Sequence, residues 1–348
     1  MKTANNRLSG VITTIQRPTE SVCKLAHRLV AVNTTLFVVG DKKGPPDYDL
    51  EGAQFLSLAY QLDSDFVLAR KLPTAHYARK NVGYLEAISQ GASCIYETDD
   101  DNAPLDNWGP RAETVRASRV EEHGWVNVYR FFCDEKIWPR GFPLDAVSDS
   151  FSKLPSLAGE TVVVQAPIQQ GLVDNSPDVD AIWRLTLDRP FDFQPGTSVL
   201  LPRGAWCPFN SQSTWWFSVA FPLMYLPSFC SFRMTDIWRS FIAQRCLWEM
   251  NLGIVFHGPE VVQQRNEHDL MRDFADEIPG YTRNKEIVAI LEGLTLTKGA
   301  DAVGDNLLVC YQGLVSAGVF SFDEVTLVDA WLNDLNQATS RRTCSAIR

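Results

Sequence analysis

The first hundred residues predict an α/β fold: a Rossmann-like parallel sheet whose strands are joined by right-handed helical crossovers. Short apolar or β-branched runs alternate there with segments that carry apolar residues at helical spacing. The apolar fraction of 45% and the charged fraction of 21% are those of an ordinary globular protein. With 348 residues, the chain is long enough for one large domain with an appendage, or for two domains.

The predicted elements of this half follow one another at short intervals. Thr19 or Ser21 is expected to cap the first helix, because either hydroxyl can accept a hydrogen bond from a first-turn amide. Gly91 is expected to end a later helix. The expected elements are strands at 11–15, 36–39, 66–69 and 94–98, and helices from 19 or 21 to 29, at 50–62 and at 77–89.

The second half predicts fewer strands and, from residue 270, only helices. We assign residues 1–269 to the main α/β domain. Residues 270–340 form a helical appendage that packs on it or mediates homo-oligomerisation, and residues 341–348 form a mobile tail. The expected elements are strand-like runs at 181–185 and 253–256, and helices at 236–250, 286–294, 306–317 and 322–335.

Charge and composition exclude several classes of protein. A net charge of −10 argues against a nucleic-acid binder, which would present a basic face. The most apolar stretch, residues 215–230, is broken by Pro222 and Pro227, so no transmembrane segment is expected. Residues 1–10 are polar and lack the apolar segment of a signal peptide. The eight cysteines form no CxxC pair, which fits free thiols in the cytoplasm.

Three consecutive aspartates follow the predicted strand at 94–98. Aspartate disfavours a strand interior, so the strand should end there and present Asp99, Asp100 and Asp101 at its carboxyl edge, where open α/β sheets bind ligands. Alternate residues of an extended chain point the same way. Asp99 and Asp101 can therefore converge on Mg²⁺ or Mn²⁺, while Asp100 points elsewhere. The alternative is a solvated acidic turn.

Polar residues also follow the first two predicted strands. The chain has neither GxGxxG nor GxxxxGK[ST], so a dinucleotide oxidoreductase or a P-loop enzyme is not expected. A nucleotide can still lie on the strand ends without those loops. The residues that could hold its base, ribose and phosphates there are Thr13, Thr14, Arg17, Asp41 and Lys42. Each taken alone could equally be an ordinary loop residue.

Arg79 and Lys80 open the helix before the aspartates. Cations near a helix amino end oppose the helix dipole, so their presence there is locally unfavourable. A bound pyrophosphate would explain the conflict, because helix amino ends and arginines both favour anions. A solvated Arg–Lys pair is the alternative.

Four motifs of the first third resemble the STELLO-type glycosyltransferases, whose plant members are Golgi proteins associated with cellulose synthesis. They occur in order, at 11–19 (VITTIQRPT), 38–43 (VVGDKK), 77–84 (YARKNVGY) and 95–102 (IYETDDDN). The resemblance implies a GT-A fold, a nucleotide-sugar donor with uridine as the base, and a DxD-like metal site at residues 99–101, with Asp100 beside the donor. A Golgi role is not carried over, since no membrane anchor is predicted.

The middle of the chain is more distantly similar to the reversibly glycosylated polypeptides, which include UDP-arabinopyranose mutases. The likeness lies at 138–143 (WPRGFP), 170–181 (QGLVDNSPDVDA) and 236–239 (DIWR). Those enzymes carry a glycosylated arginine shortly after the first motif. The corresponding place here, near Ala146 and Val147, has no arginine, which argues against a self-glycosylating mutase.

Three residues of the second half could contact a sugar. Asp178 and Asp180 could bind sugar hydroxyls, and the third candidate, Trp238, offers a flat apolar face. Each aspartate could instead make an Asx-type turn. Asp236 opens a predicted helix, so the simplest interpretation is an N-cap. By the GT-A resemblance, a carboxylate at such a helix start is the general base of inverting enzymes.

Later residues could complete the site. By the same resemblance, a late histidine joins the metal ligands, and either His257 or His268 could serve, although a lone histidine is more often structural. Arg265 could contact the diphosphate, where negative charge develops as the sugar leaves.

These observations favour a metal-dependent glycosyltransferase. It would move a sugar from a nucleoside-diphosphate sugar to a saccharide or glycan acceptor, in cell-surface polysaccharide synthesis. A nucleotide-sugar mutase and a non-catalytic partner protein of the same fold are the alternatives.

Overall fold

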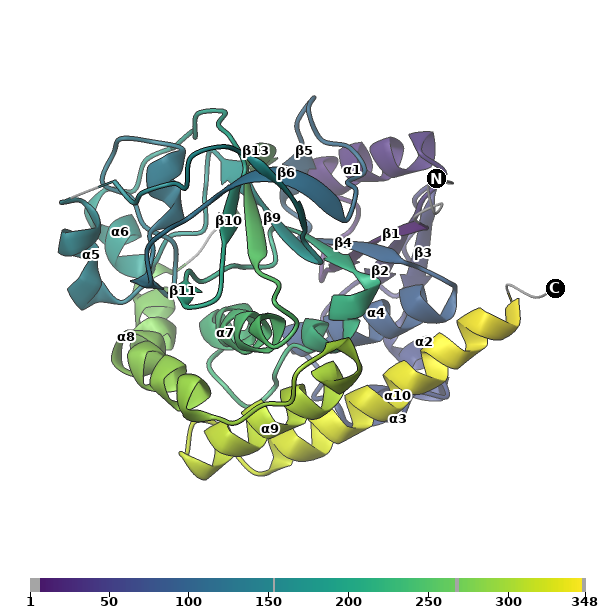
Figure 1. Cartoon of the computed structure of the whole chain (residues 1–348). Helices are drawn as coiled ribbons and strands as arrows, with labels where there is room; N and C mark the ends of the chain where they lie inside the picture. Colours follow the sequence, from purple (N-terminus) through teal and green to yellow (C-terminus); the bar gives the residue numbers. More distant parts are fainter. Residues whose placement is uncertain (1–6, 153, 267–268, 346–348) are drawn as a thin grey trace.

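A mixed β-sheet forms the centre of the computed structural model, which describes residues 7–152, 154–266 and 269–345. Eleven strands join this sheet in the order β3-β2-β1-β4-β12-β9-β13-β10-β6-β8, with β5 paired to β13 (Figure 1). The strands are β1 (Leu8–Thr13), β2 (Thr35–Val39), β3 (Ala53–Leu56), β4 (Cys94–Thr98), β5 (Asn102–Pro104), β6 (Thr114–Arg119), β8 (Val162–Gln165), β9 (Ile168–Asp174), β10 (Val199–Leu201), β12 (Ser213–Phe217) and β13 (Ile254–Gln263); β7 (Gly124–Trp125) and β11 (Ala205–Trp206) form a separate pair.

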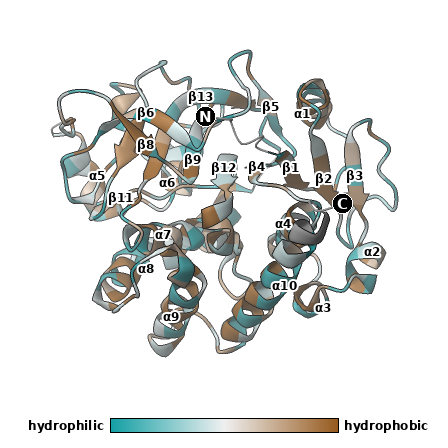
Figure 2. Ribbon diagram, turned by 45° about the vertical axis from the view of Figure 1, so that its right-hand side comes forward, coloured by the Kyte–Doolittle hydropathy of each residue, from teal (hydrophilic) through white to brown (hydrophobic). Residues whose placement is uncertain are grey.

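Helices cover both faces of the sheet. In Figure 2, α1 lies above the sheet, while α4 and α7 to α10 lie beneath it. The α-helices are α1 (Glu20–Ala31), α2 (Leu58–Asp63), α3 (Val67–Lys71), α4 (Lys80–Ser89), α5 (Leu144–Ser150), α6 (Ala181–Thr186), α7 (Thr235–Trp248), α8 (Leu270–Gly293), α9 (Val303–Ser316) and α10 (Asp323–Ser345). Short 3₁₀ turns are η1 (Tyr77–Arg79), η2 (Val128–Phe131), η3 (Ser218–Met224), η4 (Phe232–Met234) and η5 (Ala300–Ala302).

The alternation of side chains along the strands builds two cores. Successive strand residues face opposite sides of a sheet. On β12, Trp215 accordingly packs on the α1 side, while Trp216 packs on the side of α4 and α7. Both indoles are fully buried. The strands near the centre of the sheet are therefore apolar on both faces.

The order of the first four strands creates a topological switch point beside β1. β3, β2, β1 and β4 are parallel neighbours, and β1 lies between β2 and β4, so that Val11 pairs with Phe37 on one side and Glu97 on the other. The connections from β1 and into β4 leave in opposite directions across the sheet. Such a switch point opens a crevice at the carboxyl ends of the strands. This confirms the predicted parallel α/β arrangement of the first hundred residues.

Several predicted elements differ from the structure. Residues 53–56 form β3 and residues 67–71 form a short helix, where the sequence predicted a helix and a strand respectively. Residues 181–186 are helical, because Asp180 accepts the Trp183 amide hydrogen and caps α6. Two signals were interpreted correctly: Thr19 caps α1, and Gly91 follows α4 with φ +97°.

The C-terminal helices, which the sequence predicted to pack on the main domain or to mediate oligomerisation, share the larger core with the sheet. Fully buried Trp331 of α10 packs edge-on against Tyr84 of α4. Glu324 accepts the backbone amides of Ser228 and Phe229, so α10 also holds the loop before α7. The helix continues to Ser345, into the predicted tail. Within the described ranges, no helix has the length and apolarity needed to cross a membrane.

Candidate functional site

The three aspartates form a tight turn at the carboxyl end of β4. Thr98 ends the strand and donates to the Gln212 carbonyl (2.5 Å). Across the turn, the Asn102 amide donates to the Asp99 carbonyl (3.3 Å), and β5 then pairs with β13. The turn therefore lies at the carboxyl end of the strand, as the sequence predicted, and the strand order places it at the switch point between β1 and β4.

Asp100 is bound by the loop after β1. The Thr14 hydroxyl donates to Asp100 Oδ2 (2.5 Å), and the Thr19 hydroxyl donates to its carbonyl (2.5 Å). Burial raises the pKa of Asp100, a rise that the Thr14 hydrogen bond partly offsets. Asp100 thus joins the end of β4 to the loop after β1.

Asp99 lies beside the amino end of α4. Its Oδ1 accepts hydrogen bonds from the Tyr77 hydroxyl (2.7 Å) and from Lys80 Nζ (2.8 Å). The Lys80 side chain is fully buried, whereas that of Asp99 is 26% exposed. One oxygen of Asp99 is therefore charge-compensated by the protein, while the carboxylate as a whole still reaches solvent.

Asp101 carries an unsatisfied oxygen. Its Oδ2 accepts a hydrogen bond from Gln263 Nε2 (3.0 Å) at the end of β13. Its Oδ1 is buried without a hydrogen-bond partner among the described residues. Burial raises the pKa of Asp101 to about 7, and the charge of Asp99 adds to the rise. A buried carboxylate oxygen without a partner is costly, and a bound cation would relieve that cost.

Asp99 and Asp101 are the residues of this turn that could hold a hard divalent cation shared with a substrate. In the part of the chain that the structure describes, no group of three or more His, Cys, Asp or Glu residues could hold a metal by itself. Mg²⁺ and Mn²⁺ commonly take only one or two carboxylates and complete their coordination with phosphates and water. Asp99 and Asp101 offer such a pair.

Four other predicted nucleotide-binding residues surround the ends of β1 and β2. Thr13 donates to the Val39 carbonyl (3.1 Å), which ties these two strands together. Asp41 accepts the backbone amides of Lys42 (2.6 Å) and His76 (2.9 Å), so both its oxygens shape the loop. The side chain of Lys42 is exposed, and so is that of Arg17, which lies 3.9 Å from Asp47.

Arg79 lies away from the aspartates, contrary to the prediction. Its side chain is fully buried and donates to Gln61 Oε1 (2.7 Å), to the Leu72 carbonyl (3.2 Å) and to the Ala69 carbonyl (3.1 Å). These bonds tie α2 and α3 to the start of α4. The unfavourable cation at this helix end is therefore balanced by carbonyl groups, and the geometry gives Arg79 a structural role.

A second charged cluster lies at the amino end of α7. Arg140 makes a bidentate pair with Asp178 (2.7 and 2.9 Å) and pairs with Asp236 Oδ2 (3.0 Å). Burial alone would raise the pKa of Asp236, but the Arg140 guanidinium outweighs it and holds that pKa below the usual range. Asp236 lies inside the first turn of α7 instead of at its cap, since Met234 precedes the helix.

The two clusters are neighbours. The Ser211 amide donates to Asp236 Oδ2 (3.3 Å), and Ser211 lies two residues before Ser213, which pairs with Thr98. Tyr77 lies close enough to both Asp99 and Asp236 for their charges to raise its pKa, in addition to the larger effect of burial. The structure therefore places Asp236 on the α7 side of the aspartate turn.

Glu97 connects these clusters beneath the surface. It is fully buried and accepts hydrogen bonds from Arg239 Nη1 (2.9 Å), Trp216 Nε1 (2.7 Å) and the Tyr84 hydroxyl. Arg239 also donates to the Ser211 hydroxyl (2.9 Å). This hydrogen-bond network fixes β4 against α7, so the two clusters are held at a constant separation.

Two predicted sugar contacts have structural roles. Asp180 is fully buried and accepts Trp138 Nε1 (2.5 Å) besides capping α6, and burial raises its pKa to about 6. Trp238 is buried against Phe320 and donates to Asn284. Neither can reach a ligand at the aspartate turn, so both predictions are corrected.

The late metal ligand is not found at His257. Both of its ring nitrogens lie within hydrogen-bonding distance of neighbouring side chains, Nδ1 of Ser198 (2.7 Å) and Nε2 of Gln169 (3.0 Å). Burial lowers its pKa well below the usual value, which keeps the ring neutral. His257 is thus a satisfied core residue of β13. The other candidate, His268, lies outside the described residues.

Arg265 follows the strand end that binds Asp101. Its Nη2 pairs with Asp273 Oδ2 (2.8 Å), and nearby Asn266 accepts a hydrogen bond from Gln16 (3.2 Å) in the loop after β1. Burial lowers the pKa of Arg265, and the charge of Arg233 lowers it further. The segment after β13 therefore borders the aspartate edge, and both arginines already have carboxylate partners, Asp273 for Arg265 and Glu277 for Arg233.

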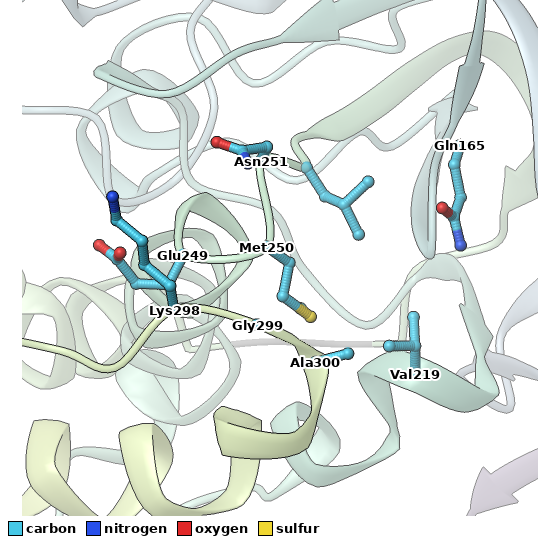
Figure 3. A pocket seen from close by; sticks show the side chains of 9 residues that line it. Gln165, Val219, Glu249, Met250, Asn251, Lys298, Gly299 and Ala300 are labelled. Atoms are coloured by element: carbon cyan, nitrogen blue, oxygen red, sulfur yellow. The ribbon is translucent and has the colours of Figure 1, made fainter.

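A pocket with no link to these residues lies elsewhere in the described part of the chain. It has a volume of about 390 Å³ and lies beside the end of α7 and the loop before α9 (Figure 3). Its lining includes Glu249, Met250 and Lys298. The Glu249 carboxylate already pairs with Arg245 (2.6 Å) and Arg203 (3.2 Å). None of the predicted site residues lines this pocket.

Three residues of this region were not predicted from the sequence: Tyr77, Arg140 and Gln263. Tyr77 and Arg140 lie in motifs that carry the family resemblances, at 77–84 and 138–143, so those motifs could have identified them. Gln263 lies at the end of a long strand with no local signal. Its role depends on the pairing of β5 with β13, which sequence patterns do not reveal.

Comparisons with known proteins agree with the first of these resemblances. A family model described as STELLO glycosyltransferases matches residues 233–342. Two Arabidopsis thaliana proteins, described as probable glycosyltransferases STELLO2 and STELLO1, are 28% and 27% identical over 345 and 346 residues. Each alignment covers 93% of this chain and 44% of the relative, so the chain spans less than half the length of these relatives.

A solved structure described as a mycobacterial protein was also found. The superposition covers 83% of this chain and 74% of the mycobacterial chain, with a TM-score of 0.39 and 10% sequence identity. This similarity is too low to support an argument about fold or function.

Proposed function

Because the chain is STELLO-like, we propose that it is a glycosyltransferase of the GT-A type that uses a nucleoside-diphosphate sugar, with a uridine nucleotide as the first candidate. The acceptor is a saccharide or glycan, as in the synthesis of cell-surface polysaccharides. A divalent cation, Mn²⁺ or Mg²⁺, would be held by Asp99 and Asp101.

One observation carries this proposal. Asp101 Oδ1 is buried without a partner among the described residues, at the switch point of the sheet and beside a second carboxylate. A structural aspartate would be expected to have both oxygens satisfied, as the fully buried Asp180 does. The unsatisfied oxygen favours a cation-binding role for the turn over a purely structural one.

The residues around the turn have distinct tasks. A bound cation would supply Lewis-acid stabilisation of the departing diphosphate. Thr14 holds Asp100 in place, and Lys80 orients Asp99. Thr13, Asp41, Lys42 and Arg17 surround the nucleotide at the ends of β1 and β2, and Arg265 approaches the diphosphate from the segment after β13.

Asp236 is the candidate general base for an inverting reaction. Its carboxylate is held by Arg140 and by the Ser211 amide, so its orientation is fixed before an acceptor binds. Its lowered pKa keeps it ionised at neutral pH. A lowered pKa also makes a weaker base, so positioning would contribute more to the rate than intrinsic basicity.

Thermal unfolding with a panel of nucleotides, each with and without Mn²⁺, tests the donor site. A nucleotide at a hundred times its dissociation constant stabilises the folded protein by about 2.7 kcal/mol, which shifts the midpoint measurably. We expect a Mn²⁺-dependent shift with UDP. The double variant Asp99→Asn, Asp101→Asn should lose it, while the surface control Asp145→Asn should retain it.

The outcomes separate the alternatives. A nucleotide shift that does not depend on metal would contradict the cation site. No shift with any nucleotide would favour a non-catalytic partner protein. Once the donor is known, transfer of its labelled sugar to an acceptor distinguishes a transferase from a mutase, which would return an isomerised nucleotide sugar.

A further inference from the structure

An exposed aromatic side chain lies beside the candidate site. Phe232 is 55% exposed, and its ring contacts Tyr77 edge-on, with 5.9 Å between the ring centroids. The Tyr77 hydroxyl donates to Asp99. Phe232 is therefore separated from the aspartate turn by a single side chain, and part of its ring remains open to solvent.

The segment that carries Phe232 is held firmly. The amides of Ser228 and Phe229 donate to Glu324 of α10, and the Ser231 hydroxyl donates to the backbone carbonyl of Asp276. Arg233 pairs with buried Glu277 of α8 (2.9 Å). The exposure of Phe232 is therefore a feature of an anchored segment, and little conformational entropy would be lost if a ligand bound to it.

Phe232 also lies next to the proposed base. η4 leads directly into α7, whose first turn carries Asp236, and the Arg233 carbonyl accepts a hydrogen bond from Arg140, the partner of Asp236. Tyr77 thus has Asp99, Asp236 and Phe232 as neighbours. An acceptor whose hydroxyl approaches Asp236 would have its sugar ring near this aromatic side chain.

We propose that Phe232 is a stacking platform for the acceptor saccharide, an inference that rests on the proposed glycosyltransferase function. The C–H groups on one face of a pyranose form an apolar surface that packs against an aromatic ring, while its hydroxyls bind polar groups around it. This assignment replaces Trp238 and Asp180, which the structure buries.

A stacked nucleotide base is the competing occupant. The residues proposed for the base and ribose lie at the ends of β1 and β2, where Asp41 follows β2 and Thr13 ends β1. Phe232 lies instead beside α7. We therefore assign the ring to the acceptor, and nucleotide binding should not depend on it.

The test uses the full chain with Mg²⁺ and UDP and three probes: the methyl glycosides of β-glucose, β-galactose and α-mannose. Saturation-transfer NMR gives the dissociation constant of each probe. At least one should bind the wild type, and Phe232→Ala should weaken that binding about tenfold, while Phe232→Tyr stays within about twofold. Phe322→Ala removes an even more exposed phenylalanine in the turn before α10 and should change nothing.

The thermal shift with Mg²⁺ and UDP is measured for each variant alongside the NMR. The proposal predicts that this shift is the same in Phe232→Ala and the wild type. Unchanged saccharide affinity in Phe232→Ala overturns it, as does wild-type protein that binds UDP but none of the probes. A folded Phe232→Ala variant that loses the thermal shift with Mg²⁺ and UDP also overturns the proposal, because the Phe232 ring would then bind the donor nucleotide. Failure of the proposed function would be distinct, since the wild type itself would show no nucleotide shift.

Discussion

Arg140 Nη2 lies 3.0 Å from Asp236 Oδ2 in an ion pair that is almost completely buried, and the same guanidinium also binds Asp178 through two hydrogen bonds. One cation therefore balances two carboxylates at the start of α7. Any change to it leaves buried charge without compensation, which is costly in a protein interior.

Replacing this cation should strongly destabilise the fold. Arg140→Met leaves Asp178 and Asp236 buried without their guanidinium, and we expect a loss of about 3–5 kcal/mol in the free energy of unfolding. Urea denaturation measures it. The matched control is Lys285→Met, which breaks an exposed pair with Asp145 and should cost well under about 1 kcal/mol. If both variants lost the same free energy of unfolding, the buried ion pair would contribute no more to stability than the exposed one.

Stability should depend on pH through Asp236. Because the folded-state pKa of Asp236 is lowered, its contribution to stability is present above the ordinary aspartate pKa of about 3.9 and is lost as the pH falls through the folded-state value. The free energy of unfolding of the wild type should therefore decline below about pH 4. Urea titrations between pH 3 and 6 should show a shallower decline for Asp236→Asn, and parallel curves would refute this assignment.

Asp236→Asn should also abolish most turnover if the carboxylate is the base. General bases contribute about 10²–10⁴-fold, so kcat should fall at least about a hundredfold while Mn²⁺-dependent nucleotide binding persists. Asp178→Asn removes the other partner of Arg140 and is the control for damage to the ion pair. A similar loss of kcat in both variants would mean that the pair acts only as a structural element.

Lys80 should tune the affinity of the proposed cation site. Its ammonium group lies 2.8 Å from Asp99 Oδ1 and opposes a second cation there. Lys80→Met should tighten Mn²⁺ binding by roughly tenfold and lower stability, since Asp99 loses a buried partner. Calorimetric Mn²⁺ titration, with the surface variant Lys24→Met as control, measures the change. Weaker Mn²⁺ binding in Lys80→Met would contradict the expected repulsion between the Lys80 ammonium group and the bound cation.

Glu324 should be essential for docking α10. It accepts the Tyr225 hydroxyl (2.5 Å) and the amides of Ser228 and Phe229 in a buried site. Glu324→Ala leaves these donors unsatisfied and should cost about 2–4 kcal/mol, whereas Glu324→Gln retains an acceptor and should cost less. Denaturant unfolding measures the free energy of unfolding of each variant, and the neighbouring surface variant Asp323→Ala is the reference. A cost for Glu324→Ala no greater than that of the reference would contradict the role.

Local patterns predicted the position of the aspartate turn and the cap of the first helix. The aspartate turn after β4 and the Thr19 cap depend on residues adjacent in sequence, so short-range chemistry was sufficient. The parallel first strands pair distant residues and were predicted from the alternation of strands and helices along the chain. Thr14 and Lys80, which the sequence assigned to a nucleotide, contact Asp100 and Asp99, because strand ends and helix starts converge at one edge of a parallel sheet.

Residues whose roles depend on distant partners could not be predicted in the same way. Arg79 has the sequence context of an anion-binding residue, yet its guanidinium donates hydrogen bonds to Gln61 Oε1 of α2 and to backbone carbonyls in and after α3. Trp238 has the chemistry of a sugar-binding residue, but the packing of α8 and Phe320 buries it. The pairing of Arg140 with Asp236 spans 96 residues and follows from the tertiary fold alone.

Electron paramagnetic resonance of Mn²⁺ tests the central claim most directly, because the signal of the free ion disappears when it binds. Titration into wild-type protein in the presence of UDP should reveal one bound Mn²⁺ per chain. Asp101→Asn should weaken that binding by at least about tenfold, and Asp145→Asn should not. Equal Mn²⁺ binding by the wild type and Asp101→Asn would contradict a cation site at the aspartate turn.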